Sequence, residues 1–182
     1  VIKAKKKFII IGNMDAITYK DVFPLIRDNK IWLGAGLNDG RNEWYRVPSD
    51  SEEYHKEEAG VKYAFVKKTI WFTNIDHGRR HRPMELMSEK DVVKFIRKSP
   101  FEKYDNYDAI DIPEVKQIPS DYKGVMGVPI SFLNKFSPEQ FELLGCNRGI
   151  DQDPSGVYGR SSYINGKETF KKLFIRHNKN GS

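Results

Sequence analysis

The stretch Phe8-Ile9-Ile10-Ile11-Gly12-Asn13 decides the fold class of this chain. Four apolar residues that end in a Gly-Asn turn are too few for a helix and are typical of a strand buried on both faces. A helical pattern follows over Tyr19–Arg27, where Pro24 is tolerated only in the first turn or at a kink. A second strand is predicted at Ile31–Leu33. Residues 8–33 are therefore predicted to form one βαβ-like unit of an α/β sheet.

Outward from this unit the sequence becomes richer in strand patterns. Runs of β-branched and aromatic residues predict strands at Trp44–Val47, Val61–Val66, Thr69–Ile75 and Val128–Leu133. Asp39-Gly40 and Asn165-Gly166 are typical hairpin turns. The acidic stretch Ser49–Gly60 is predicted to be a loop or a solvated helix, and residues 99–123, with three prolines, an extended surface segment.

Two further helices are expected from capping signals. Ser88 followed by Asp91 predicts a helix over Glu89–Arg97. The strongest local signal begins at Ser137, which is followed by Pro138 and Gln140, and ends at Gly145. This pattern predicts a helix of about two turns.

Composition limits the function classes. A chain of 182 residues is long enough for one domain, and its longest apolar run is far shorter than the roughly 20 residues that a membrane span needs. The single cysteine, Cys146, cannot form an internal disulfide, which favours a reducing, cytoplasmic location. No secretory signal pattern precedes Phe8.

The charge is basic and unevenly distributed. The net charge is +6, with +4 on residues 1–20, +5 on residues 160–182, and −4 on residues 50–58. Clustered Lys and Arg side chains favour a polyanion such as nucleic acid as the partner, although a merely basic surface is the alternative.

Several catalytic and metal-binding motifs are missing. Gly34-Ala35-Gly36 fails the dinucleotide-binding pattern, and there is neither a phosphate-binding P-loop nor a Gly-x-Ser-x-Gly elbow. His77 and His81 lack a third metal ligand, and Cys146 has no activating neighbours. We therefore expect no metal.

A basic loop is the best candidate for contact with DNA. Asp76–Arg82 contains Arg79, Arg80, His81 and Arg82 at the end of a predicted strand. Arginine forks suit phosphate oxygens and guanine edges. Tyr104 and Tyr107 could stack on bases. The alternatives are a solvated loop and two core tyrosines.

Four blocks of the chain together resemble EcoRI-type adenine-specific DNA methyltransferases. They occur in the family's order, from residue 7 to at least residue 145, and comprise Lys7–Lys20, Trp71–His77, Tyr104–Ile110 and Gly124–Gly145. The resemblance implies a doubly wound methyltransferase fold, in which Phe8–Ile11 is the fifth strand and Ile31–Leu37 with Val61–Ile75 form the closing hairpin region. It also implies transfer of a methyl group from S-adenosylmethionine to the N6 amino group of a flipped adenine.

The family's Asn-Pro-Pro-Phe motif is absent, because none of the nine prolines are adjacent, and so is its glycine-rich cofactor turn. We expect both upstream of Val1, so no catalytic or cofactor-binding residue is assigned here, and the chain alone is expected to be inactive. Asn13 could line the adenine pocket, although a turn asparagine is the alternative.

The resulting hypothesis is a C-terminal fragment of a modification methylase. Residues 1–80 would complete the catalytic sheet, and residues 81–182 would form a mixed β-rich region that recognises double-stranded DNA. A cognate restriction endonuclease is a possible partner in the same system. A free-standing DNA-binding specificity module without catalytic activity is the main alternative, and an RNA-binding β-rich protein is a third.

Overall fold

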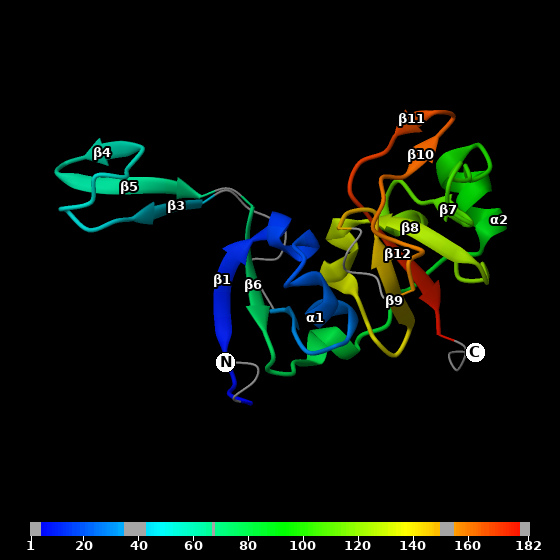
Figure 1. Cartoon of the computed structure of the whole chain (residues 1–182), viewed down its shortest axis with the longest axis horizontal. Coiled ribbons are helices and arrows are strands. Elements are labelled where there is room, and N and C mark those ends of the chain that lie inside the picture. The colour runs from blue at the N-terminus through cyan, green and yellow to red at the C-terminus, as the bar shows by residue number, and fades with distance from the viewer. Residues whose placement is uncertain (1–4, 35–42, 67, 150–154, 179–182) are drawn as a thin grey trace.

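The computed structural model (Figure 1) describes residues 5–34, 43–66, 68–149 and 155–178. Its secondary structure is mixed α/β, with several small sheets and few helices. The doubly wound sheet stays a prediction, since the described strands form separate sheets of two to four strands. The predicted turn at Asp39-Gly40 and most of the 34–36 glycine pattern lie outside the described residues.

The first sheet contains the expected strand–helix–strand unit with another strand between its ends. Its order is β1 (Ile9–Asn13), β6 (Thr69–Thr73) and β2 (Trp32–Leu33), and β6 is antiparallel to both neighbours. The 3-10 helix η1 (Met14–Thr18) and the helix α1 (Phe23–Arg27) connect β1 to β2. β1 and β2 therefore run in the same direction without being neighbours.

β1 is not buried on both faces, which corrects the sequence-based expectation. Ile9, Ile10 and Ile11 are 60%, 49% and 50% exposed. In the described residues β1 pairs with β6 alone and forms an edge of its sheet. The pattern predicted burial because a run of apolar side chains is typical of a buried strand. In the described residues, however, neither face of this edge strand is covered.

The first helix begins later than predicted. It starts at Phe23 instead of Tyr19, with Pro24 in its first turn, while Tyr19 ends η1 in an extended conformation. Proline accounts for this start, because its ring is compatible with the first turn and clashes further inside a helix.

A second sheet lies apart from the rest of the chain in Figure 1. It consists of β3 (Glu43–Arg46), β5 (Val61–Val66) and β4 (Lys56–Glu58), in the order β3-β5-β4. β4 falls within the acidic stretch that the sequence predicted to be a loop or a helix. Ala59 and Gly60, both with positive φ, make the tight turn into β5.

The third sheet occupies the C-terminal part of the chain. Its order is β7 (Ala109–Asp111), β8 (Val125–Pro129), β12 (Lys172–His177) and β9 (Phe141–Cys146). β7 and β8 are parallel, and the other neighbours are antiparallel. β8 starts and ends earlier than the predicted strand at Val128–Leu133, and residues Ile130–Lys135 form the 3-10 helix η5.

β9 corrects the strongest helix prediction. The capping residues make a single turn, in which the amides of Gln140 and Phe141 donate to the Ser137 carbonyl. The chain then pairs with β12, because Phe141 and Leu143 alternate into the core with exposed Glu142 between them. Gly145 does not stop a helix. Tyr158 packs so closely on it that an added Cβ would lie 2.4 Å from the Tyr158 Cγ atom.

The remaining elements are short. Ser88 caps α2 (Glu89–Asp91) as predicted, and this helix continues as the π-helix η3 (Val92–Arg97). Asn165 and Gly166, with φ of 51° and 74°, join two short strands and confirm the predicted hairpin. The other bounds are η2 (Gly78–His81), η4 (Val115–Gln117), β10 (Tyr163–Ile164) and β11 (Lys167–Glu168).

One hydrophobic core joins the first and third sheets. It contains Ile17, Phe23 and Ile70 from the N-terminal part and Ile110, Phe141 and Leu173 from the C-terminal part. The proposed division at residues 80 and 81 therefore falls within a continuous core. Within the described ranges, no helix is long and apolar enough to cross a membrane.

Candidate nucleic-acid interface

The predicted basic loop begins where β6 ends, and hydrogen bonds fix its position. Asn74 accepts from the Phe8 amide at 3.0 Å and donates to the Lys6 carbonyl at 2.8 Å. The Trp32 indole donates to the Ile75 carbonyl at 2.9 Å. These bonds attach the loop to β2 and to the segment before β1, so η2 starts from a fixed point.

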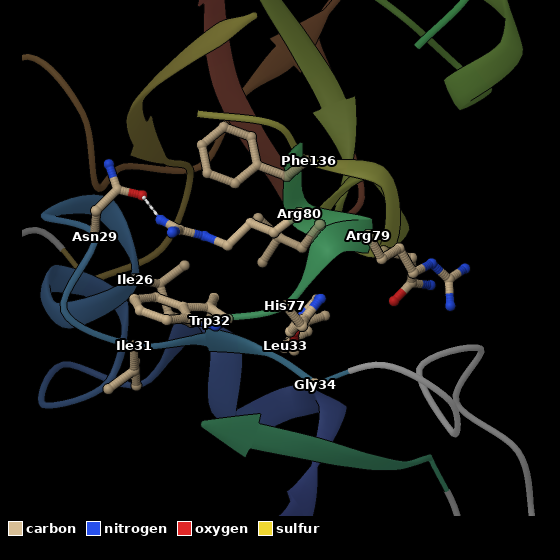
Figure 2. A pocket seen from close by; sticks show the side chains of 12 residues that line it. Ile26, Asn29, Ile31, Trp32, Leu33, Gly34, His77, Arg79, Arg80 and Phe136 are labelled. Carbon is tan, nitrogen blue, oxygen red and sulfur yellow. Dashed lines mark hydrogen bonds between the residues drawn. The ribbon is translucent and has the colours of Figure 1, made fainter. Parts of the chain in front are cut away.

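Arg80 points into the protein, as Figure 2 shows. Its guanidinium carbon lies 3.9 Å from the centre of the Trp32 ring, and Nη2 donates to Asn29 Oδ1 at 2.7 Å. The side chain is 11% exposed, and its Nη1 lies 3.8 Å from Asp76 Oδ1. Desolvation lowers the pKa of Arg80 below the usual value for arginine. Arg80 therefore packs the loop against β2 and α1 and is not positioned to contact DNA.

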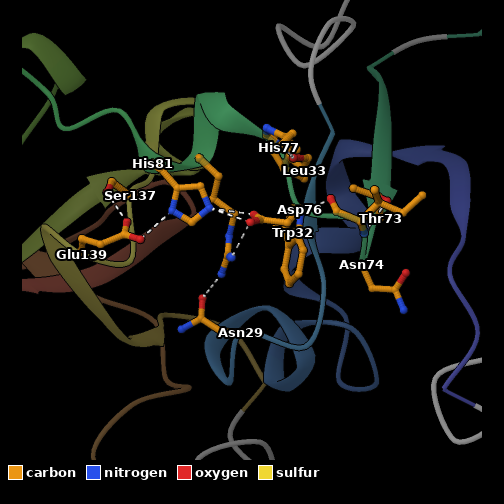
Figure 3. A network of polar contacts seen from close by, with 12 residues as sticks. Asn29, Trp32, Leu33, Thr73, Asn74, Asp76, His77, His81, Ser137 and Glu139 are labelled. Atoms are coloured by element: carbon orange, nitrogen blue, oxygen red, sulfur yellow. Dashed lines mark hydrogen bonds and ion pairs between the residues drawn. The ribbon is translucent and has the colours of Figure 1, made fainter.

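His81 lies between two carboxylates (Figure 3). Its Nδ1 is 2.6 Å from Glu139 Oε1, and its Nε2 is 2.8 Å from Asp76 Oδ1. Hydrogen bonds to Glu139 and then to Asp76 raise the pKa of His81. A protonated imidazole donates to both sides at once. His81 thus joins the loop after β6 to the turn before β9.

The two carboxylates respond in the opposite direction. The hydrogen bond from His81 lowers the pKa of Asp76. Partial burial acts to raise the pKa of Glu139, but the hydrogen bonds from His81 and Ser137 outweigh this effect and lower it. The cluster is therefore most stable with a charged histidine between two charged carboxylates.

Arg79 and Arg82 are the members of the loop that remain available to a partner. Both are exposed, and neither forms an ion pair with another described residue. In Figure 2 the Arg79 side chain points away from the side chains around Arg80. Two arginines on a loop with a fixed base can bind phosphate oxygens with little loss of conformational freedom in the backbone.

Tyr104 and Tyr107 lie in the core, which was the alternative reading of these residues. They are 5% and 9% exposed and pack against Phe174. Tyr104 donates to Asp111 Oδ1, and Tyr107 donates to the Arg160 carbonyl at 2.6 Å. Burial, followed by the contact with Asp111, raises the pKa of Tyr104. Neither ring face is open to a base in this arrangement.

Asn13 is found in a turn, as the alternative interpretation of this residue predicted. Its side-chain oxygen accepts from the Asp15 amide at 2.8 Å and caps η1. It is exposed at the end of β1, so its contact with adenine stays a prediction.

Neither of the two hollows beside the basic loop fits S-adenosylmethionine. The cavity around Arg80 has a volume of about 20 Å³, whereas sites for molecules of this class occupy roughly 300–1,000 Å³. An open hollow of about 460 Å³ beside Trp71 is large enough, but its lining offers Asp76 as the only carboxylate, and that group is engaged by His81. We therefore derive no step through the cofactor from this chain.

No metal site or nucleophile emerges in the described part of the chain. No three His, Cys, Asp or Glu side chains there are arranged to hold a metal ion. Cys146 is buried, and its thiol donates to the Arg148 carbonyl at 2.9 Å.

Sequence reasoning missed the partners that fix this loop. Glu139 was expected within the helix after Ser137, Trp32 within a strand, and Asn29 had no assigned role, yet all three contact Arg80 or His81. The loop and Glu139 are 58 residues apart, and no local pattern reports a contact of that separation.

Comparison with known proteins gives a consistent family assignment. The family model described as adenine-specific methyltransferase EcoRI matches residues 1–181. The chain is 44% identical to the Type II methyltransferase M.EcoRI of Escherichia coli over 168 residues, which cover 90% of this chain and 50% of that protein. No solved structure matches the chain.

Two mycoplasma proteins are also similar. The identity is 30% over 190 residues to the Type II methyltransferase M.MpnI of Mycoplasma pneumoniae, and 32% over 191 residues to M.MgeORF184P of Mycoplasma genitalium. The chain covers 58% of each relative. It therefore spans about half the length of the relatives it matches.

Proposed function

This chain belongs to the EcoRI-type adenine-specific methyltransferase family, and from that premise we propose that it serves in S-adenosylmethionine-dependent N6 methylation of adenine in double-stranded DNA. The match of the family model to residues 1–181 is the observation that carries the proposal. Relatives named Type II methyltransferases support the reaction class. A cognate endonuclease that cuts the same site is part of the proposal for the whole protein.

Within that activity, the chain would provide DNA binding and part of the sheet. The absent Asn-Pro-Pro-Phe motif and the poor fit of the two hollows beside the basic loop to the cofactor support this division of labour. In our proposal another part of the protein binds S-adenosylmethionine, which supplies the methyl group when bound. The described residues of this chain would hold and orient the duplex.

The exposed β1 strand would receive the rest of the catalytic sheet. Three isoleucines, Ile9, Ile10 and Ile11, are about half exposed or more, although isoleucine is among the residues most often buried. An edge strand with exposed apolar side chains on both faces is suited to pair with another strand and to pack against helices.

On the DNA side, Arg79 and Arg82 are the candidate contacts that the fold leaves exposed. Arg80, His81, Tyr104 and Tyr107 would act indirectly, by fixing the loop and the C-terminal sheet. Recognition of the target sequence by residues 81–182 remains part of the proposal.

Two measurements on the 182-residue chain test this division. Isothermal titration calorimetry with S-adenosylmethionine should give no binding, and transfer of tritiated methyl groups to unmethylated DNA should be absent. Stoichiometric cofactor binding by this chain would contradict the division of labour.

Reading the encoding gene upstream of Val1 distinguishes the main alternative. An in-frame Asn-Pro-Pro-Phe sequence is the expected result. A start codon directly before Val1 would instead favour a free-standing DNA-binding specificity module.

A further inference from the structure

The side chain of Phe170 faces solvent, while hydrogen bonds from the buried Asn147 fix the backbone around it. Its side chain is 91% exposed, in the segment between β11 and β12. Its carbonyl oxygen, by contrast, accepts a 2.8 Å hydrogen bond from Asn147 Nδ2, and Asn147 is fully buried. A single exposed apolar residue is unremarkable on its own. The buried polar group that fixes its backbone distinguishes this one.

Hydrogen bonds of Asn147 connect its own segment to Ser162 and to the segment from Phe170 to Lys172. Asn147 Nδ2 also donates to Ser162 Oγ at 2.8 Å, and Asn147 Oδ1 accepts from the Lys172 amide at 2.8 Å. The Thr169 amide donates to the Ser162 carbonyl at 2.8 Å, and their two hydroxyl groups are hydrogen-bonded to each other. These bonds fix the backbone on both sides of Phe170, while its ring projects into solvent.

The surroundings of Phe170 suit a phosphate backbone. Lys171, the residue after Phe170, and Lys68 both pair with Asp15, at 3.4 Å and 3.1 Å. The hydrogen bond from Lys68, together with Lys171, lowers the pKa of Asp15. Lys167 on β11 is exposed.

Two of the three carboxylates that line the hollow beside Phe170 are paired with cations, and the third, Glu102, forms no ion pair with a described residue. Lys172 pairs with Asp111 at 2.8 Å, and Arg148 pairs with Glu168 at 3.1 Å. Because Asp15 lies two residues beyond the end of β1, its bond to Lys171 also places the Phe170 segment near the end of that strand.

We propose that Phe170 is a wedge that inserts between base pairs of duplex DNA and props open the stack beside the target adenine. This inference rests on the proposed function, because an enzyme that modifies a base must first take that base out of the stack. Apolar side chains that kink or unstack a duplex are inserted in this way by other DNA-binding proteins. A wedge must be exposed before binding and stand on a fixed backbone: Phe170 is 91% exposed, and the bonds of Asn147 hold its carbonyl and the Lys172 amide.

Helix unwinding tests the proposal without knowledge of the recognition sequence. A nicked plasmid is sealed by ligase with the 182-residue chain bound, and the topoisomers are separated after the protein is removed. Insertion unwinds DNA, so the wild-type chain should shift the distribution to a lower linking number, and Phe170→Ala should remove most of that shift. Phe170→Trp, which keeps an aromatic wedge, should retain it.

The matched control is Phe95→Ala. Phe95 is also an exposed phenylalanine, at 57%, next to a lysine that lies over its ring, but it lies on η3. This variant should unwind DNA as the wild type does. Duplex affinity, followed by fluorescence anisotropy, should fall between about 5- and 150-fold for Phe170→Ala, the range that stacking of an aromatic ring on a base contributes.

The outcomes separate the two proposals. If the wild-type chain binds the duplex without unwinding it, or if Phe170→Ala unwinds as well as the wild type, the wedge is wrong. An equal loss in Phe95→Ala also overturns it. If the wild-type chain does not bind duplex DNA at all, the proposed function itself fails. Because Phe170 is exposed, its substitution should leave thermal stability unchanged, which confirms that the variant is folded.

Discussion

The loop after β6 and the segment between β11 and β12 make opposite use of their residues. The loop carries a cluster of cationic side chains, yet Arg80 packs inward on Trp32, and His81, although exposed, is held between Glu139 and Asp76. The β11–β12 segment carries an aromatic side chain that would suit a core, yet Phe170 faces solvent. The difference teaches that residue type alone does not identify a binding surface. What matters is whether the fold has already given each side chain a partner.

The largest loss of stability is expected when the side chain of Asn147 is removed. Asn147→Ala removes three hydrogen bonds, to the Lys172 amide, the Phe170 carbonyl and the Ser162 hydroxyl, of which the hydroxyl keeps its bond to Thr169. We expect the free energy of unfolding to fall by about 2–4 kcal/mol, measured by urea denaturation. A loss below about 0.5 kcal/mol would show that the hydrogen bonds of Asn147 do not stabilise the backbone around Phe170.

A smaller loss is expected for Arg80→Ala. This change removes the contact with Trp32 and the bond to Asn29, which should cost about 1–3 kcal/mol of folding free energy. Arg79→Ala is the matched control, since Arg79 is exposed and should change stability by less than about 0.5 kcal/mol. Equal losses in the two variants would contradict the assignment of Arg80 to packing.

DNA binding should show the reverse ranking of these arginines. Arg79→Ala combined with Arg82→Ala should weaken duplex binding and reduce the slope of log K against log salt by about 2, or about 1 per lost phosphate contact. Fluorescence anisotropy between about 50 and 200 mM salt measures this slope. An unchanged slope would mean that the loop is ordinary surface.

The smallest effect is expected from His81→Gln, and it should depend on pH. Because the folded-state pKa of His81 is raised, its stabilising contribution is fully present below the unfolded pKa of about 6.5 and is lost as pH rises through the folded value. The stability difference between wild type and variant should therefore be larger at about pH 6 than at about pH 9. A difference that is independent of pH would exclude a charged histidine in this cluster.

Acid should weaken the same cluster from the other side. The pKa values of Asp76 and Glu139 are lowered in the folded state, so their contribution is present above their unfolded values of about 4 and is lost as pH falls further.

The sequence predicted those turns and helix caps that a few adjacent residues determine. The Asn165-Gly166 hairpin and the Ser88 cap were identified because a few adjacent residues decide them. The strand–helix–strand order at the N-terminus was also predictable, although not the strand β6 that lies between its ends. The capping signal at Ser137 was satisfied within one turn and then overridden, because pairing with β12 buries Phe141.

The side chains left exposed for a partner were less predictable, because exposure depends on distant contacts. Arg79 and Arg80 are neighbours in the sequence, and only contacts with Asn29 and Trp32 distinguish them. Phe170 resembles any core phenylalanine until its place between Asn147 and Lys172 is known. Family resemblance, by contrast, was visible in the sequence, because blocks that recur in order do not depend on the fold being known.

Titration of duplex DNA with the 182-residue chain tests the central claim, that this chain is the DNA-binding part of an adenine methyltransferase, most directly. Fluorescence anisotropy at low salt should show saturable binding, and log K should fall linearly with log salt as phosphate contacts release counterions. A chain that is folded by circular dichroism but does not bind duplex DNA at about 50 mM salt would contradict the account.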